Sequence, residues 1–168
     1  MESAQLKALQ EPIKQQYKDD PDSAVITLKA QGRAGEGITC NVQTSKGLVQ
    51  AGLHPATGGN GMFACSGDML LEALVACAGV TLRAVATSIG VGLHDAVVKA
   101  EGDLDFRGTL GVSKEAPVGF RDIRLSFEVE SDADAEQLAT LLRLTERYCV
   151  VYRTLANPPP IETSMSRA

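Results

Sequence analysis

The residues that decide the fold are the run DMLLEALVACAGVTLRAVATSI, residues 68–89. The run is apolar on nearly every side of a helix, a pattern typical of a helix buried at the centre of a globular protein. Charged residues inside the run and glycines around it argue against a membrane-spanning segment. The cysteine within the run, Cys77, is therefore expected to lie in the core of the protein rather than on its surface.

The composition is typical of one compact domain. The chain has 168 residues, of which 44% are hydrophobic, and this is enough to bury a core. Its formal net charge of −5 does not suit nucleic-acid binding, which needs clustered Lys and Arg. The N-terminal residues lack the apolar core of a secretion signal. We therefore expect a cytoplasmic protein, in which a pair of thiols is more often redox-active than a structural disulfide.

Apolar periodicity predicts the remaining elements. Residues 4–18 carry apolar residues at helical spacing, so residues 1–22 are predicted to form an N-terminal helical extension and 23–168 a single domain. Strands are predicted at 25–30, 38–43, 48–51, 96–106 and 123–130. Residues 131–134 supply capping side chains for a helix that carries four leucines, namely Leu138, Leu141, Leu142 and Leu144. This order of strands and helices predicts an α+β class.

The four cysteines are not clustered in the sequence, and together with His54 and His94 they form no spacing typical of a zinc site. No metal is therefore expected. Cys40 falls on a predicted strand, where we expect a structural role. Cys65 precedes the long helix and is a candidate for a competing disulfide if its loop folds back. Cys77 and Cys149 lie far apart in the chain, so only the fold can bring them together. A lone buried cysteine is usually a small packing residue.

The stretch from Ser66 to Arg83 resembles the first signature of the OsmC/Ohr proteins, thiol-dependent peroxidases that reduce organic hydroperoxides. The matching residues are Asp68, Leu70-Leu71, Ala73-Leu74, Ala76-Cys77 and Thr81-Leu82-Arg83. Residues 148–155 resemble the second signature, in which a cysteine opens a short helix. Two positions depart from the family pattern. Val150 follows the second cysteine where many members have proline, and Gly67 stands where one branch has an acid.

The resemblance implies an OsmC-like fold, with antiparallel sheets packed around the long buried helix and two chains intertwined as a homodimer. It also implies a role for each cysteine. Cys77 would be the peroxidatic thiol, Cys149 the resolving thiol, and an external dithiol or lipoyl-type compound the reductant, with no bound cofactor. An arginine from an N-terminal loop would support the thiolate; Arg33 is the first candidate, with Arg83 and Arg153 as alternatives. Asp68 would orient that arginine, cap the helix, or do both.

Two other interpretations stay open at this point. The chain is either a peroxidase or a non-catalytic OsmC-like stress protein that binds a small hydrophobic ligand, and in the second case Cys77 is a packing residue. A third possibility is a thiol enzyme with a different electrophilic substrate. Cys77 would then be essential and Cys149 dispensable, because no disulfide needs to form.

Overall fold

The computed structural model describes residues 2–19, 31–34, 39–43, 47–111 and 113–167. It confirms the α+β class. The elements, in order, are α1 (Ser3–Asp19), β1 (Gln31–Ala34), β2 (Thr39–Gln43), β3 (Leu48–Gly52), the 3₁₀ turn η2 (Pro55–Thr57), β4 (Ala64–Cys65), α2 (Ser66–Ile89), β5 (Asp95–Leu104), α3 (Phe106–Thr109), β6 (Phe120–Glu130), α4 (Ala135–Tyr148) and α5 (Val150–Ala156). The helix predicted in the N-terminal extension is present as α1. The strand predicted at 25–30 lies outside the described residues.

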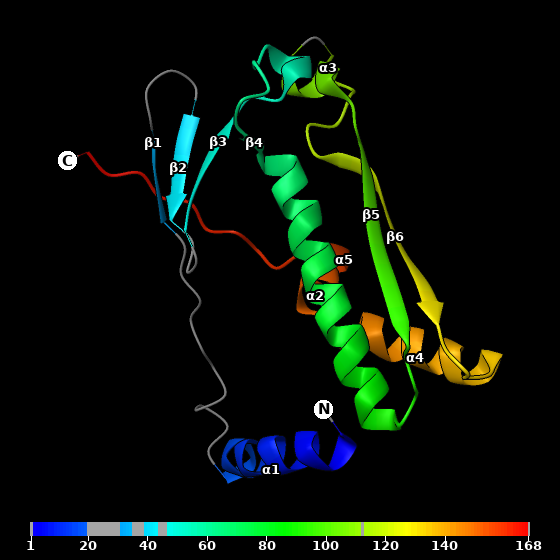
Figure 1. The fold of residues 1–168 in the computed structure, drawn as a ribbon. Coiled ribbons are helices and arrows are strands. Elements are labelled where there is room, and N and C mark those ends of the chain that lie inside the picture. The colour runs from blue at the N-terminus through cyan, green and yellow to red at the C-terminus, as the bar shows by residue number, and fades with distance from the viewer. Residues whose placement is uncertain (1, 20–30, 35–38, 44–46, 112, 168) are drawn as a thin grey trace.

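The strands form two separate sheets on different sides of α2 (Figure 1). In the first sheet β1, β2 and β3 pair antiparallel, and β4 adds a short parallel pair to β3. The second sheet is the antiparallel pair of β5 and β6, in which Val98 lies opposite Phe127. The alternating burial along β5 and β6 agrees with the alternation in the sequence, since one face of the pair is turned to α2.

One predicted strand is shorter than expected. The alternation predicts a strand over residues 96–106, whereas β5 ends at Leu104. The reason is local, because the carboxylate of Asp105 accepts a hydrogen bond from the backbone N–H of Arg107 at 3.1 Å and so caps α3. The same carboxylate holds the Arg107 guanidinium, and this hydrogen-bonded ion pair lowers the pKa of Asp105 to about 2.

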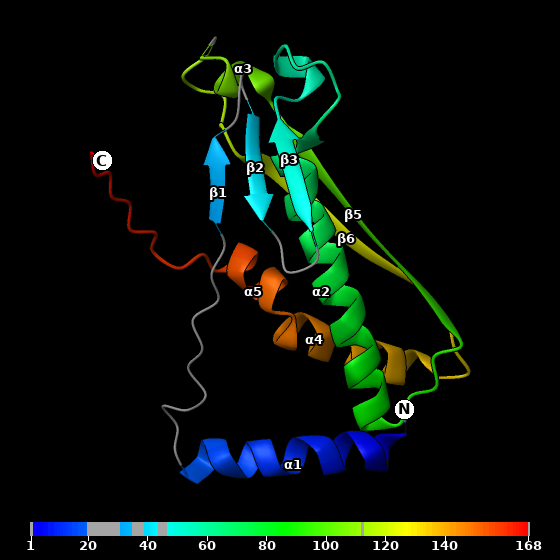
Figure 2. The ribbon, with the colours of Figure 1, turned by 60° about the vertical axis from the view of Figure 1, so that its left-hand side comes forward.

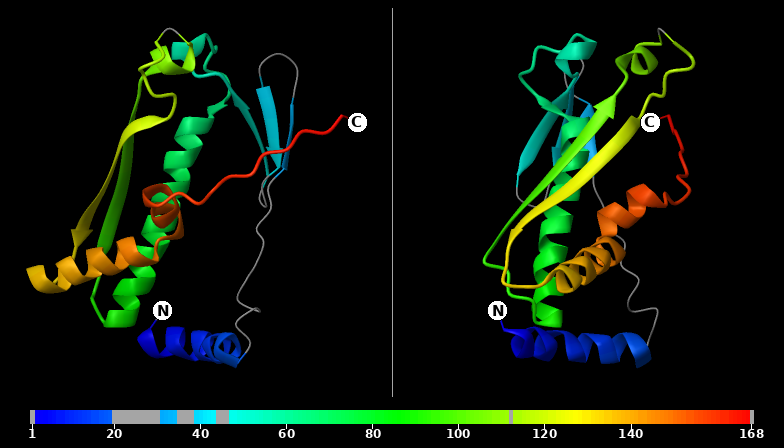
Figure 3. Two further views of the ribbon diagram at one scale, coloured as in Figure 1. Left: turned by 180° about the vertical axis from the view of Figure 1, so that it is seen from behind. Right: turned by 90° about the vertical axis from the view of Figure 1, so that its right-hand side faces the viewer.

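The buried side of α2 is the centre of the core. Its buried residues recur every three or four positions, as one face of a helix requires, and are Leu74, Ala78, Leu82, Val85 and Ala86. Leu141 of α4 packs into the same cluster. Figures 2 and 3 show α4 and α5 crossing α2 on one side, and α1 lying across the C-terminal end of α2.

The opposite side of α2 is open in the single chain. Val80, which lies opposite the buried residues of the helix, is 73% exposed, and the alanines on the same side, Ala73, Ala76 and Ala84, are exposed as well. In length and composition α2 resembles a membrane-spanning helix, but the core helices of soluble proteins share these two properties. One chain therefore buries α2 along one side only, and burial on every side stays a prediction that requires a second chain.

The ends of α2 and α4 are set by local backbone interactions. Gly90 ends α2 in the left-handed conformation, at φ +75°, and its N–H donates to the Ala86 carbonyl. Asp134 starts α4 with a capping box, in which its carboxylate accepts from the Gln137 N–H at 2.8 Å and the Gln137 side chain accepts from the Asp134 N–H at 3.0 Å. The capping residues predicted at 131–134 are thus confirmed for α4.

A candidate redox site

Cys149 lies at the junction of two helices. It follows the last residue of α4 and precedes the first residue of α5, with an extended backbone at φ −72° and ψ 109°. Its N–H donates to the Thr145 carbonyl at 2.9 Å, and its carbonyl accepts from the Arg153 N–H at 2.9 Å. Its side chain forms no cap, so the first N–H groups of α5 have no partner within the helix.

The N–H groups at the start of α5 face the Cys77 thiol on α2. Cys77 lies in the middle of α2, which α5 contacts, and is half-buried, whereas Cys149 is 1% exposed. The backbone N–H groups of Val151 and Val150 donate to the Cys77 sulfur, and the Cys149 thiol is hydrogen-bonded to the same atom. The fold thus brings together two cysteines that the sequence separates by most of its length.

The surroundings shift the two thiols in opposite directions. Burial acts to raise the pKa of Cys77, but hydrogen bonds from the Val151 N–H, the Cys149 thiol, the Val150 N–H and the Thr81 hydroxyl outweigh it and lower this pKa. Burial raises the pKa of Cys149, and the adjacent Cys77 adds to that effect, whereas backbone hydrogen bonds from Tyr152 and Val151 offset it only in part. Cys77 is therefore the thiol that ionises first, and Cys149 keeps its proton and donates it in a hydrogen bond.

The predicted supporting residues lie elsewhere. Asp68 lies nine residues before Cys77 in a continuous helix, roughly 13 Å along the axis, so this structure does not bring the two together. Asp68 is also not the helix cap. The helix begins at Ser66 after Cys65, and Asp68 is an exposed residue of the first turn, where a negative charge is favourable. Ser66 is likewise inside the helix.

The candidate arginines are not seen at the sulfur in the described part of the chain. Arg83 donates to the carbonyl of Leu93 at 2.6 Å. Arg153 is exposed in the last turn of α5. Arg33 lies in β1 opposite Asn41, and its side chain is outside what the structure describes. Hydrogen-bond donors alone therefore account for the lowered pKa of Cys77 among the described residues.

The other cysteines do not join the pair. Cys65 precedes Cys77 by twelve helical positions, roughly 18 Å along the axis of α2, whereas a disulfide needs Cα atoms within about 7 Å. The prediction that Cys65 competes as a disulfide partner is wrong for this reason. Cys40 lies in β2 opposite Ala51, and its side chain is outside the described residues. Among the residues that the structure describes, no group of three His, Cys, Asp or Glu side chains suits a metal ion.

The donors at Cys77 are what sequence reasoning missed. Two of them are backbone N–H groups, which a sequence motif cannot indicate because a motif specifies side chains. One signal was nevertheless present, because a residue other than proline after Cys149 has an N–H to donate. The departure at Val150 therefore adds a donor to the site.

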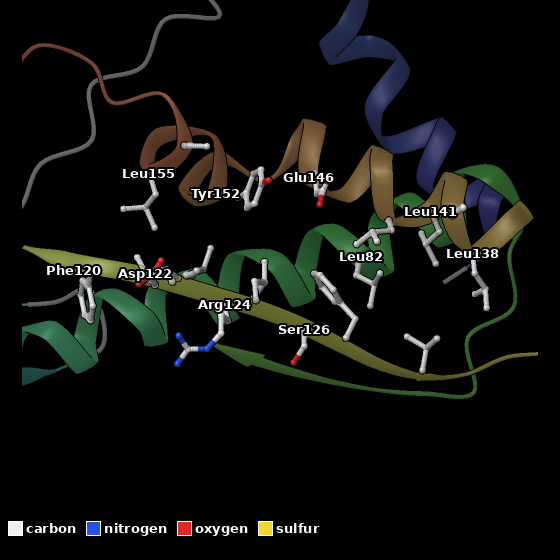
Figure 4. A pocket seen from close by; sticks show the side chains of 18 of the residues that line it. Leu82, Phe120, Asp122, Arg124, Ser126, Leu138, Leu141, Glu146, Tyr152 and Leu155 are labelled. Atoms are coloured by element: carbon white, nitrogen blue, oxygen red, sulfur yellow. The ribbon is translucent and has the colours of Figure 1, made fainter. Parts of the chain in front are cut away.

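An open groove of about 1030 Å³ lies beside the site, between β6 and the helices α4 and α5 (Figure 4). Leucines and aromatic residues line most of it, and Arg124, Asp122 and Glu146 lie along its length. The two thiols are not among its lining residues. Leu74, one turn before Cys77, and Tyr152, on the first turn of α5, mark the part of the groove nearest to them.

Val150→Pro tests whether the backbone donor acts on the thiol. Val150 is the first residue of α5, where proline is tolerated, and Cys149 already has the extended backbone that precedes proline. The substitution thus removes one N–H and leaves the helix in place. We expect alkylation of Cys77 by iodoacetamide at pH 7 to slow by about 10-fold, since a hydrogen bond to a charged group is lost.

Val150→Ala is the matched control for this change. The Val150 side chain is 70% exposed, so alanine removes little packing and keeps the N–H. The pH dependence of its alkylation rate is expected to match that of the unmodified protein. Equal profiles for the proline and alanine variants would contradict a role for the Val150 N–H, and circular dichroism would check that both retain their helices.

Comparisons with known proteins agree on the fold. A model of the OsmC-like protein family matches residues 59–164. The structure is similar to an OsmC like protein from Mycoplasma pneumoniae, with 14% identity, a TM-score of 0.66, and coverage of 79% of this chain and 89% of that one. It is also similar to an organic hydroperoxide resistance protein OsmC from Legionella pneumophila, described as a predicted redox protein, with 18% identity, a TM-score of 0.61, and coverage of 79% and 93%.

A third similar structure is an organic hydroperoxide resistance protein from Elizabethkingia anophelis. It is 15% identical, with a TM-score of 0.61, and the alignment covers 79% of this chain and 91% of that one. No curated protein sequence matches the chain. At these identities the structural likenesses show an OsmC-like fold, and the family match rests on the sequence between residues 59 and 164.

Proposed function

Because this chain belongs to the OsmC-like protein family, we propose that it is a thiol-dependent peroxidase that reduces organic hydroperoxides. The observation that carries the proposal is the hydrogen-bonded contact between the Cys77 and Cys149 thiols, where α5 packs on α2. The lowered pKa of Cys77 and the raised pKa of Cys149 agree with it. Two of the structural neighbours are named as organic hydroperoxide resistance proteins, which supports the same class of reaction.

The proposed cycle has three balanced steps. The Cys77 thiolate attacks the terminal oxygen of the hydroperoxide, the O–O bond breaks, and the alkoxide takes a proton to leave as an alcohol; the sulfur is now a sulfenic acid. The Cys149 thiol attacks this sulfur, which forms a disulfide and releases water. A dithiol or lipoyl-type reductant then exchanges with the disulfide, and both thiols return while the reductant becomes a disulfide.

The burial of the two thiols suits these roles. A peroxidatic sulfur must be reached by substrate, and Cys77 is half-buried rather than enclosed. The resolving thiol needs to meet only the Cys77 sulfur, so the nearly complete burial of Cys149 does not hinder it. Arg33 is proposed to add a positive charge at the thiolate from the first sheet, with Arg153 as the alternative, because the Arg83 guanidinium is bonded to the Leu93 carbonyl. Asp68 is proposed as the partner that orients this arginine.

We also propose a homodimer, in which the exposed side of α2 packs against a second copy. Val80 lies on that side together with Ala73, Ala76 and Ala84, and their exposure leaves apolar surface that a partner would cover. Such a dimer would bury the central helix on every side, as its composition predicts. Val80 lies three residues after Cys77, so the same contact would enclose one edge of the site.

Peptide mapping tests the proposed reaction. The protein is treated with one equivalent of cumene hydroperoxide or of hydrogen peroxide, digested without reduction, and examined by mass spectrometry. We expect a peptide pair joined through Cys77 and Cys149, formed in higher yield with the organic peroxide. If both thiols stay reduced with both peroxides, the chain is not a two-cysteine peroxidase.

The groove supports a second candidate, the binding of a small hydrophobic ligand without catalysis. It is mainly apolar, and neither thiol lines it, so a ligand held there need not meet Cys77. In that case both thiols stay reduced in the mapping experiment, and a fluorescent fatty-acid probe binds equally well to the protein and to Cys77→Ser.

A further inference from the structure

Thr81 lies one helical turn after Cys77 and is half-buried. Its hydroxyl donates to the carbonyl oxygen of Cys77 at 2.8 Å. Thr87 and Thr145 make the same bond to the residue four positions earlier, each at 2.8 Å. At Thr87 and Thr145 this is the hydrogen bond that a threonine hydroxyl commonly makes inside a helix. Thr81 differs because the residue four positions before it is the ionising thiol.

The Thr81 hydroxyl is also within hydrogen-bonding reach of the Cys77 sulfur. A hydroxyl has one hydrogen to donate, so the carbonyl and the sulfur of Cys77 compete for it. The carbonyl does not depend on this hydrogen, because it also accepts the backbone N–H of Thr81 within α2. Turning the hydroxyl toward the sulfur therefore leaves no buried acceptor without a partner.

We propose that Thr81 is a further catalytic residue, whose hydroxyl turns from the Cys77 carbonyl to the Cys77 sulfur when that sulfur becomes a thiolate. A thiolate is the stronger acceptor, because a hydrogen bond to an ionised group is roughly twice as strong as one between neutral groups. The hydroxyl therefore stays on the carbonyl while Cys77 is protonated and moves when the proton leaves. This assignment rests on the proposed peroxidase function, because the first step of that reaction requires the Cys77 thiolate that the hydroxyl would stabilise.

The test compares Thr81→Val with Thr81→Ser. Valine keeps the branched shape and removes the hydroxyl, whereas serine keeps the hydroxyl and removes a methyl group. The rate of iodoacetamide alkylation of the Cys77 peptide is measured against pH by mass spectrometry. We expect Thr81→Val to react roughly 2- to 10-fold more slowly at pH 7, with its profile moved to higher pH, and Thr81→Ser to follow the unmodified protein.

Thr87→Val is the matched control, because it removes the same kind of bond from the same helix nearly three turns away from Cys77. Its profile should not move. Equal profiles for Thr81→Val and the unmodified protein would overturn the proposal, and so would a Thr81→Ser profile displaced as far as that of Thr81→Val, which would indicate packing by the methyl group. Alkylation needs no peroxide, so this result is independent of whether the disulfide forms with cumene hydroperoxide.

Discussion

Cys77→Ser should abolish the reduction of cumene hydroperoxide. The attacking group is a thiolate whose charge is held by N–H and hydroxyl donors, and a serine hydroxyl in the same place stays protonated at neutral pH. We expect the rate of peroxide loss, measured with excess dithiothreitol or dihydrolipoamide as reductant, to fall by roughly a thousandfold or more, which brings it to the rate without protein.

Cys65→Ser is the control for this loss. Cys65 is a free cysteine at the start of α2, roughly 18 Å along the helix axis from Cys77, so its replacement should leave the rate unchanged. A Cys77→Ser variant that still consumed peroxide would refute the assignment of Cys77 as the peroxidatic thiol. Loss of activity in both variants would place the reactive sulfur elsewhere or show that the fold had failed.

The elements whose pattern is local could be predicted from the sequence. The long apolar run became α2, the alternating run ending at Glu130 became β6, and Asp134, among the predicted capping residues, became the N-cap of α4. Each of these follows from interactions between residues a few positions apart. The pairing of Cys77 with Cys149 is different. Only the family resemblance implied it, because contacts of such long sequence separation leave no periodicity.

The failures have equally physical causes. Asp68 was a reasonable cap by residue type, but Cys65 ends β4 with an extended backbone, and α2 starts directly after it. Burial of α2 on every side is not tested by one chain, whose contacts cover only one side of the helix, and it stays a prediction. The donors from α5 were invisible because any residue except proline supplies a backbone N–H.

Arg83 illustrates how helical geometry limits a prediction. It belongs to the family motif and lies six residues after Cys77, which is not a spacing that places two side chains on one face. In the structure its guanidinium donates to the Leu93 carbonyl, at the turn that leads from α2 to β5. This residue therefore ties the end of the helix to the following strand, and the site obtains its described donors from α5 and from Thr81 instead.

Cys149→Ser should allow one turnover and then stop. The first step needs only Cys77, so one equivalent of cumene hydroperoxide should convert it to the sulfenic acid, which dimedone traps as a stable adduct. Without the resolving thiol the sulfenic acid is exposed to more peroxide and advances to the sulfinic and sulfonic acids. We expect intact-mass spectra to show successive additions of oxygen, where the unmodified protein loses two hydrogens.

Cys149→Ala separates the two contributions of Cys149. Serine at this buried position still offers a hydroxyl hydrogen to the Cys77 sulfur, whereas alanine offers none, so only the alanine variant should also form its sulfenic acid more slowly at pH 7. Both variants should lose sustained turnover. Sustained turnover by either one would show that the reductant reaches the Cys77 sulfenic acid directly, and the chain would then act as a one-cysteine peroxidase. The difference between first-step rates in the two variants measures what the Cys149 hydrogen bond contributes to the thiolate before any disulfide exists.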